Sequence, residues 1–223
     1  MRLILASASP RRAELLRAAG YTFDVVVGEV DESIRPGESP SVYVQRLAAA
    51  KSAAVLAALK GCATPDTDAS KGCATSVTDV AQGFSRDVAQ GFSPADLVVL
   101  GADTTVVVDG ETLGKPGNDD EATGMLRRLS GKAHDVLTGV SLRQGAHEVG
   151  RVEVTAVAFR ALTDEDIAWY VASREGRDKA GGYAIQGLAS RFIPSISGSY
   201  SNVVGLPVAC VAELLRALLA SRL

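Results

Sequence analysis

Two adjacent arginines at the start of a predicted helix are the first candidates for chemistry. A short apolar run over residues 3–6 indicates a strand, and Ser9 and Pro10 follow it. Serine is a good N-cap and proline fits the first helical position, so a helix is expected here. Arg11 and Arg12 then fall in its first turn, where the helix dipole disfavours cations. A bound anion would explain them, held by free backbone N–H groups and by both guanidinium groups. The alternative is a surface helix whose arginines are solvated.

Asp103 is the second candidate, because it lies inside the most apolar strand of the chain. Residues 97–108 indicate a buried strand with a bend at Gly101. A carboxylate there is costly to bury unless a cation or metal pairs with it, or unless the strand opens into a cleft. Asp103 is therefore a candidate general base or metal ligand. The alternative is an aspartate that caps a turn at the end of a strand.

Three further charged residues are candidates only in combination. Lys115 follows Gly114 in a tight turn, and Lys51 is four residues after Leu47 on a long predicted helix. A lysine at the border of an apolar stripe can reach over the helix edge into a cleft. Glu32 follows the second predicted strand and is a plausible acidic partner. Taken singly, Lys115 and Lys51 are better explained as ordinary surface lysines, and carboxylates such as Glu32 are common in loops.

A glycine-rich segment over residues 178–187 matches neither the dinucleotide motif GxGxxG nor the P-loop motif. Its glycines allow a close approach of backbone to a ligand, and Gln186 offers a donor and an acceptor to the edge of a base. The segment is equally compatible with a connecting loop.

The elements that must position these residues alternate along the chain, which indicates an α/β fold. Asp109-Gly110 is typical of a hairpin turn, and Thr163 with Asp166 resembles a capping box. The predicted strands cover residues 3–6, 23–27, 97–108, 136–142 and 152–159, and the predicted helices begin near Ser9, Ser39, Asn118, Thr163 and Pro207.

Residues 60–96 interrupt this alternation. The segment is rich in Gly, Ser, Thr, Asp and Ala and holds two direct repeats, residues 60–64 with 71–75 and residues 79–85 with 87–93. Two short copies are too few for a solenoid. We expect an inserted surface loop with no catalytic part. The alternative is a lid or partner-binding segment anchored by Phe84 and Phe92.

Composition excludes several classes of function. The 223-residue chain has a net charge of −3, whereas a general nucleic-acid binder would be basic. No apolar stretch is expected to reach the roughly 18 residues of a membrane span, and the N-terminus lacks a signal-peptide pattern. The three cysteines lack CxxC spacing and the two histidines lack HExxH spacing, so neither a disulfide framework nor a zinc site is indicated. These features predict a soluble, cytoplasmic protein.

Together, these motifs resemble the Maf family of nucleoside triphosphate pyrophosphatases. The resemblance covers nearly the whole chain except residues 60–96. The matching segments are SASPRR at 7–12, VDE at 30–32, residues 47–51, GADT at 101–104, GKP at 114–116, residues 126–131, residues 178–187 and VGLP at 204–207.

The resemblance implies one domain over residues 1–223, interrupted by the insertion. Its expected fold is a long twisted mixed sheet with flanking helices that form two lobes around a cleft, similar to inosine triphosphatases. The family hydrolyses the α–β phosphoanhydride of a nucleotide with a divalent cation, Mg²⁺ or Mn²⁺. The resemblance also implies a homodimer with a nucleoside triphosphate substrate, whereas the composition predicts no nucleic-acid or membrane partner.

The resemblance also implies residue roles. Asp103 matches the proton acceptor, and Arg11, Thr104 and Gln186 match positions that set base preference. The metal ligands stay unassigned. The rest of the polar pocket corresponds to Ser7, Arg12, Glu32, Lys51 and Lys115. The three base-preference residues follow the subfamily that acts on dTTP and UTP. The alternatives are a 7-methyl-GTP pyrophosphatase and a nucleotide-binding regulator of cell division.

Overall fold

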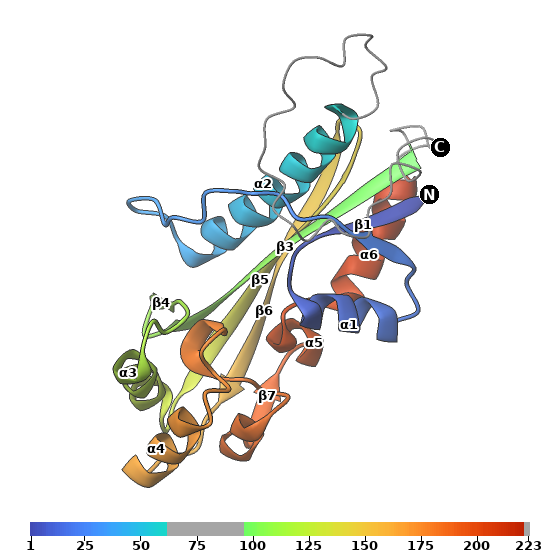
Figure 1. Cartoon of the computed structure of the whole chain (residues 1–223). Coiled ribbons are helices and arrows are strands. Elements are labelled where there is room, and N and C mark those ends of the chain that lie inside the picture. The colour runs from blue at the N-terminus through green and yellow to red at the C-terminus, as the bar shows by residue number, and fades with distance from the viewer. Residues whose placement is uncertain (62–95, 221–223) are drawn as a thin grey trace.

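A mixed seven-stranded sheet organises the molecule (Figure 1). The computed structural model describes residues 1–61 and 96–220. The strand order is β2-β1-β3-β5-β6-β7, and β4 pairs with β3. β1 is parallel to β2 and β3, whereas the other pairings are antiparallel. The strands are β1 Arg2–Ala6, β2 Phe23–Val25, β3 Leu97–Val108, β4 Glu111–Leu113, β5 Ala133–Gln144, β6 His147–Ala158 and β7 Ser195–Ser197. The α/β class and the mixed sheet expected from the sequence are confirmed.

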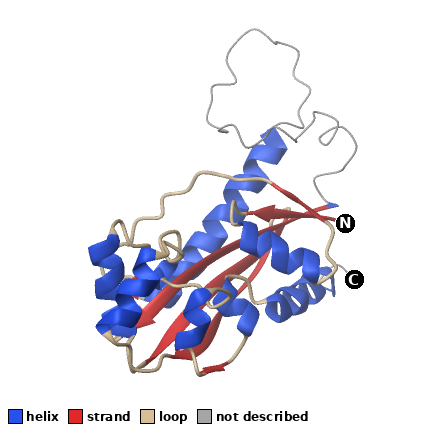
Figure 2. Ribbon diagram, turned by 60° about the horizontal axis from the view of Figure 1, so that its bottom comes forward, coloured by secondary structure: helices blue, strands red, loops and turns tan. Residues whose placement is uncertain are grey.

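Helices cover both faces of this sheet (Figure 2). Alternate residues of β1 point to opposite faces, so Leu3 and Leu5 join one hydrophobic cluster while Ile4 joins another. α1 and α6 contribute to the cluster that holds Leu3 and Leu5, and α2 packs over the cluster that holds Ile4. The helices are α1 Pro10–Ala18, α2 Pro40–Gly61, α3 Asp119–Leu129, α4 Asp164–Ala172, α5 Tyr200–Val204 and α6 Val208–Ala220, with 3₁₀ helices η3 Ala180–Gly182 and η4 Leu188–Phe192.

The long strand β3 connects two hydrophobic cores. Leu100 and Ala102 belong to the first core, which lies beneath α1 and α6. Val106 and Val108 belong to the second core, which includes residues of α3 and α4. Thr104, on the same face of β3, lies in the gap between these cores. The two-lobed arrangement therefore places the middle of β3 where a cleft can open.

Two glycines let α2 lie directly on the sheet. A Cβ atom on Gly101 would come within 2.1 Å of the Ala48 carbonyl oxygen, and one on Gly139 within 2.3 Å of the Val44 carbonyl oxygen. Gly139 is also the register partner of Asp103 across β3 and β5. The missing side chain at Gly139 thus brings α2 over the strand that carries Asp103.

Helix α2 is also long and apolar enough to cross a bilayer by length and composition, alone among the helices of the described ranges. The expectation that no stretch meets this criterion is therefore wrong for residues 40–60. Val44, Leu47 and Val55 are nevertheless fully buried in the protein. α2 packs against β3 and β5, which identifies it as a core helix.

The sequence signals located most elements. Asn118 and Thr163 cap α3 and α4 as predicted, and Asp166 completes the capping box of α4. Ser9 is the N-cap residue of α1, but its side chain makes no capping hydrogen bond. The predicted hairpin turn at Asp109-Gly110 is confirmed, because it joins β3 to the antiparallel strand β4. The short elements β7, α5, η3 and η4 were not predicted. The predicted insertion at about 60–96, with Cys62 and Cys73, falls almost entirely outside the described residues.

Candidate active site

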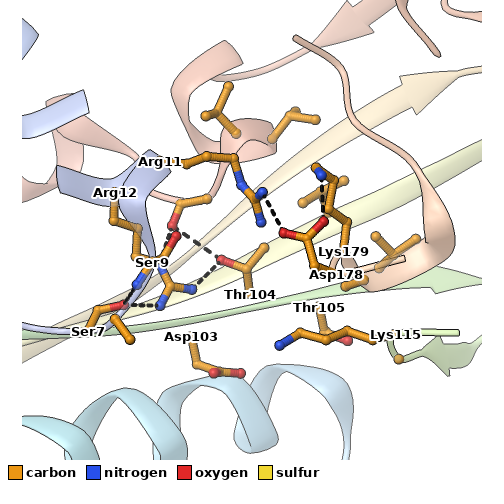
Figure 3. Close-up of a pocket in the computed structure, with 18 of the residues that line it drawn as sticks. Ser7, Ser9, Arg11, Arg12, Asp103, Thr104, Thr105, Lys115, Asp178 and Lys179 are labelled. Atoms are coloured by element: carbon orange, nitrogen blue, oxygen red, sulfur yellow. Dashed lines mark hydrogen bonds and ion pairs between the residues drawn. The ribbon is translucent and has the colours of Figure 1, made fainter. Parts of the chain in front are cut away.

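A cavity of about 650 Å³ opens at the middle of β3. It receives side chains from β3, from the start of α1, from α2 and from the glycine-rich segment before and after η3 (Figure 3). Five cationic side chains line it against three carboxylates, so an anionic ligand is electrostatically favoured. All nine residues singled out from the sequence line this cavity: Ser7, Arg11, Arg12, Glu32, Lys51, Asp103, Thr104, Lys115 and Gln186.

Lys51 joins two carboxylates on the α2 side of the cavity. Its Nζ lies 2.7 Å from Asp103 Oδ1 and 2.6 Å from Glu32 Oε1. The side chains of Lys51 and Asp103 are 14% and 12% exposed, whereas Glu32 is 57% exposed. Asp103 is therefore shielded but still reachable from the cavity. The ammonium of Lys115 points toward Asp103 from across the pocket in Figure 3.

Opposing influences act on the pKa of Glu32. Partial burial raises it, but the hydrogen bond and charge of Lys51, with the charges of Lys115 and Arg12, outweigh burial. The pKa of Glu32 is consequently lowered. The carboxylate is thus charged at neutral pH.

The loop that carries Glu32 is fastened to α2 by Arg46 and Tyr43. The Arg46 guanidinium donates to both carboxylate oxygens of Glu38 and to the carbonyl oxygens of Asp31 and Ser33. Tyr43 donates its hydroxyl proton to the Glu32 carbonyl oxygen at 3.0 Å. These contacts lie on both sides of Glu32 and hold it near Lys51, although no local pattern in the sequence predicts them.

Arg12 lies in the cavity wall with most of its donors bonded to the protein. Its Nε donates to the Gly205 carbonyl at 2.8 Å, and its Nη1 donates to Ser7 Oγ and the Ala102 carbonyl. Its Nη2 donates to Thr104 Oγ1 at 3.0 Å. Burial lowers the pKa of Arg12. Arg12 therefore ties α1, β3 and the segment after α5 together, besides any contact with a ligand.

Arg11, in contrast, reaches across the cavity to the glycine-rich segment. Its Nη1 lies 3.1 Å from Asp178 Oδ2, and the other oxygen of Asp178 lies 2.6 Å from Lys179 Nζ. The Asp178 side chain is 66% exposed. Partial burial raises the pKa of Asp178, but the hydrogen bonds from Lys179 and Arg11 lower it further, so that the net shift is downward. Figure 3 shows the carboxylate of Asp178 between the side chains of Arg11 and Lys179.

A divalent cation is compatible with the donors of the site. Glu32 and Asp103 present hard carboxylate oxygens that converge on one point, now held by Lys51 Nζ. No group of three or more His, Cys, Asp or Glu side chains within residues 1–61 and 96–220 could hold a metal. Mg²⁺ is commonly held by one or two carboxylates together with substrate phosphates. The two carboxylates therefore fit a cation that arrives with a polyphosphate.

The sequence missed several residues of this cavity. Asp178, Lys179 and Tyr183 lie within the glycine-rich segment, from which only Gln186 was selected. Adjacent charges just before two glycines are a signal that could have identified Asp178 and Lys179. Tyr43 gave no comparable signal, because its position depends on how α2 meets the Glu32 loop.

The cavity surrounds a shielded carboxylate with cationic side chains. An α/β protein with such a cavity is of the class that binds polyanionic ligands beside a candidate general base. The chain belongs to the Maf-like protein family, whose model matches residues 2–218.

Curated relatives are similar to this chain over almost its whole length. A protein of Syntrophus aciditrophicus is 44% identical, covering 96% of this chain and 89% of its own. One of Symbiobacterium thermophilum is 46% identical, with 96% and 92% covered. One of Escherichia coli strain K12 is 45% identical, with 96% and 91% covered. Each of the three is named dTTP/UTP pyrophosphatase.

Proposed function

We propose that this protein hydrolyses dTTP and UTP to the nucleoside monophosphate and pyrophosphate. The observation that carries the proposal is the ion pair of Asp103 with Lys51 inside a cavity lined by five cations. The dTTP/UTP pyrophosphatase names of the relatives support this substrate choice over 7-methyl-GTP. No feature of the cavity favours the alternative of a cell-division regulator.

The chemistry assigned to the chain is an attack of water on the α–β phosphoanhydride. Asp103 accepts a proton from the water molecule while the water oxygen bonds to the α-phosphorus. Pyrophosphate leaves with the electrons of the broken P–O bond. Arg11 and Lys115 are placed to neutralise the phosphate oxygens. A guanidinium can bind them with two hydrogen bonds, whereas a lysine acts as a point charge.

A divalent cation, Mg²⁺ or Mn²⁺, is part of the proposal. Glu32 and Asp103 would hold it together with substrate oxygens. When bound, it supplies charge neutralisation at the phosphates and helps to orient the reacting groups. Lys51 would then be displaced from at least one of its two carboxylates and be free to meet a phosphate.

Base selection is assigned to the opposite side of the cavity. Gln186 and Thr104 line it there with Arg11. The Thr104 hydroxyl already lies 2.9 Å from Thr138 Oγ1 and accepts from Arg12. Gln186 is therefore the better candidate for direct contact with the 4-keto group of uracil or thymine.

Asp103→Asn tests the proposal. The variant should bind dTTP with a dissociation constant within a few-fold of wild type and lose about 10²- to 10⁴-fold in kcat, the usual contribution of a general base. Pyrophosphate release under Mg²⁺, Mn²⁺ and no added metal gives the measurement. Asp120→Asn, on the exposed start of α3, is the matched control and should keep full turnover. Unchanged kcat in Asp103→Asn would remove Asp103 from the mechanism.

We also propose that the protein is a homodimer, that it lies in the cytoplasm and that it has no nucleic-acid or membrane partner. The nucleoside triphosphate is the one partner that the names of the relatives support.

A further inference from the structure

Gln186 presents a free amide to the cavity from a loop without regular structure. Its side chain lines the cavity and has no hydrogen-bond partner within the described part of the protein. An amide can turn either its donor or its acceptor to a base edge. Its ability to discriminate therefore depends on a backbone that holds it at a fixed place.

Tyr170 of the second core and the half-buried Glu175 hold this backbone. Tyr170, at the end of α4, is 1% exposed, and its ring packs against Phe192. Its hydroxyl accepts a hydrogen bond from the Ala184 backbone N–H at 3.0 Å. The same hydroxyl donates its proton to Glu175 Oε2 at 2.9 Å. Tyr170 thus joins the backbone before Gln186 to the Glu175 carboxylate.

Glu175 fixes the backbone on the other side of Gln186. Its Oε1 accepts from the Leu188 backbone N–H at 2.9 Å, and its Oε2 accepts from Ala189 N–H at 3.4 Å. The loop passes so close that a Cβ atom on Gly187 would lie 1.9 Å from Glu175 Oε1. Because that carboxylate has several partners, it has little freedom to move aside. Gln186 is consequently held from two residues before it and from two and three residues after it.

We propose that Tyr170 and Glu175 are positioning residues that set the base preference of the cavity by fixing the backbone on both sides of Gln186. The inference rests on the proposed function, because it takes the ligand to be a pyrimidine nucleotide. Uracil carries an acceptor at position 4 and cytosine carries a donor there. A fixed amide distinguishes the two edges, and a loosened one adapts to either.

Tyr170→Phe tests this inference, because it removes the hydroxyl and keeps the ring in the core. UTP, CTP and tripolyphosphate are titrated into the protein by calorimetry without divalent metal, so no turnover is needed. UTP affinity should fall about tenfold, the effect of roughly one lost hydrogen bond. CTP and tripolyphosphate should bind within twofold of their wild-type affinities. Tyr200→Phe is the matched control, because Tyr200 is exposed and its hydroxyl has no partner within the described ranges. This variant should match wild type for all three ligands.

Two outcomes with Tyr170→Phe would overturn the inference. An equal loss for all three ligands would show general damage to the cavity, and an unchanged ratio of UTP to CTP affinity would show no positioning role. If Tyr170→Phe does not fold, Glu175→Gln is measured in its place with the same expectations. Where both fold, the double variant should lose no more discrimination than either single variant, since both act through one loop.

Wild-type turnover of UTP separates this inference from the proposed function. If the wild-type protein binds UTP in preference to CTP but hydrolyses neither, the proposed function is wrong, and a loss of this preference in Tyr170→Phe still supports the inference. A protein that hydrolyses UTP while Tyr170→Phe keeps full discrimination supports the function and overturns the inference. Equal wild-type affinity for UTP and CTP also overturns it.

Discussion

At the scale of single residues, the two neighbouring arginines of α1 have different surroundings. Arg12 is buried and donates to carbonyl or hydroxyl oxygens on β3, before α1 and after α5. Arg11 makes one ion pair with an exposed carboxylate, Asp178. The sequence assigned both guanidinium groups to an anion, but it contains no signal for backbone carbonyls that lie 90 and 193 residues away. Arg11 is thus the arginine with donors available to a ligand.

Lysine substitutions should separate these roles. Arg12→Lys cannot replace four hydrogen bonds and leaves buried acceptors unsatisfied, so stability should fall by about 2–4 kcal/mol. Arg11→Lys removes only a partly exposed pair and should change stability by less than about 1 kcal/mol. The KM for dTTP should nevertheless rise severalfold in Arg11→Lys. Urea unfolding and steady-state kinetics measure the two effects, and equal destabilisation by both substitutions would contradict the assignment.

At the scale of elements, the close packing of α2 on β3 and β5 builds the acidic side of the cavity. Gly139 lies beside Asp103 in the sheet and directly beneath the α2 backbone. Helix α2 in turn carries Lys51 and the two side chains that fasten the Glu32 loop. A change in the distance between helix and sheet would therefore disturb the ion pair of Lys51 with Asp103.

Gly139→Ala should test this packing. The new Cβ would meet the Val44 carbonyl oxygen at 2.3 Å, so the helix or the strand must shift. We expect a stability loss of roughly 1–3 kcal/mol, typical of overpacking, together with lower kcat. Gly124→Ala on the exposed face of α3 is the control, since a Cβ there meets nothing within 4 Å. The control should keep its activity and gain up to about 1 kcal/mol. Normal stability and activity in Gly139→Ala would refute the packing argument.

Elements with strong local signals were predictable from the sequence, and short elements were not. The caps Asn118 and Thr163 located α3 and α4, and the apolar run of β3 located Asp103. β7 and α5 have three and five residues, too few for a periodic pattern, and tertiary contacts hold them. The membership of the cavity was predictable because seven of the eight matching segments, all except residues 126–131, contribute residues to it. The supporting contacts of Arg46, Tyr170 and Glu175 depend on the folded backbone, which no local pattern encodes.

At the scale of the whole molecule, the two cores share β3 and β5. Ala102 and Val140 belong to the first core, and Val106 and Val136 on the same two strands belong to the second. The cavity lies between the cores and is lined by Val106 and Val136 of the second core. Unfolding of one core would break strands needed by the other, so the cores should unfold together.

Lowering the pH should test whether the two cores unfold together, because a buried histidine of the second core makes stability depend on pH. His134 is 3% exposed, and its Nε2 lies 2.7 Å from the Tyr183 hydroxyl. Burial lowers the pKa of His134 to about 4, from 6.5. Between these values the unfolded chain binds a proton that the folded protein does not, so stability falls as pH decreases from 6.5 to 4. The total loss is about 3 kcal/mol at most.

Urea midpoints at pH 7, 6 and 5 measure this loss with two probes. Fluorescence of Trp169, the one tryptophan of the chain, reports on α4 and the second core. Far-ultraviolet circular dichroism reports on the whole protein. The two midpoints should coincide and decrease together as the pH falls, because the shared strands couple the cores. His134→Gln cannot titrate in this range, so its midpoint should change much less between pH 7 and 5. An equal pH dependence in this variant would exclude His134 as the cause. Separate midpoints would mean that the second core unfolds on its own, taking the loop of Gln186 with it while the helices around Arg12 stay folded.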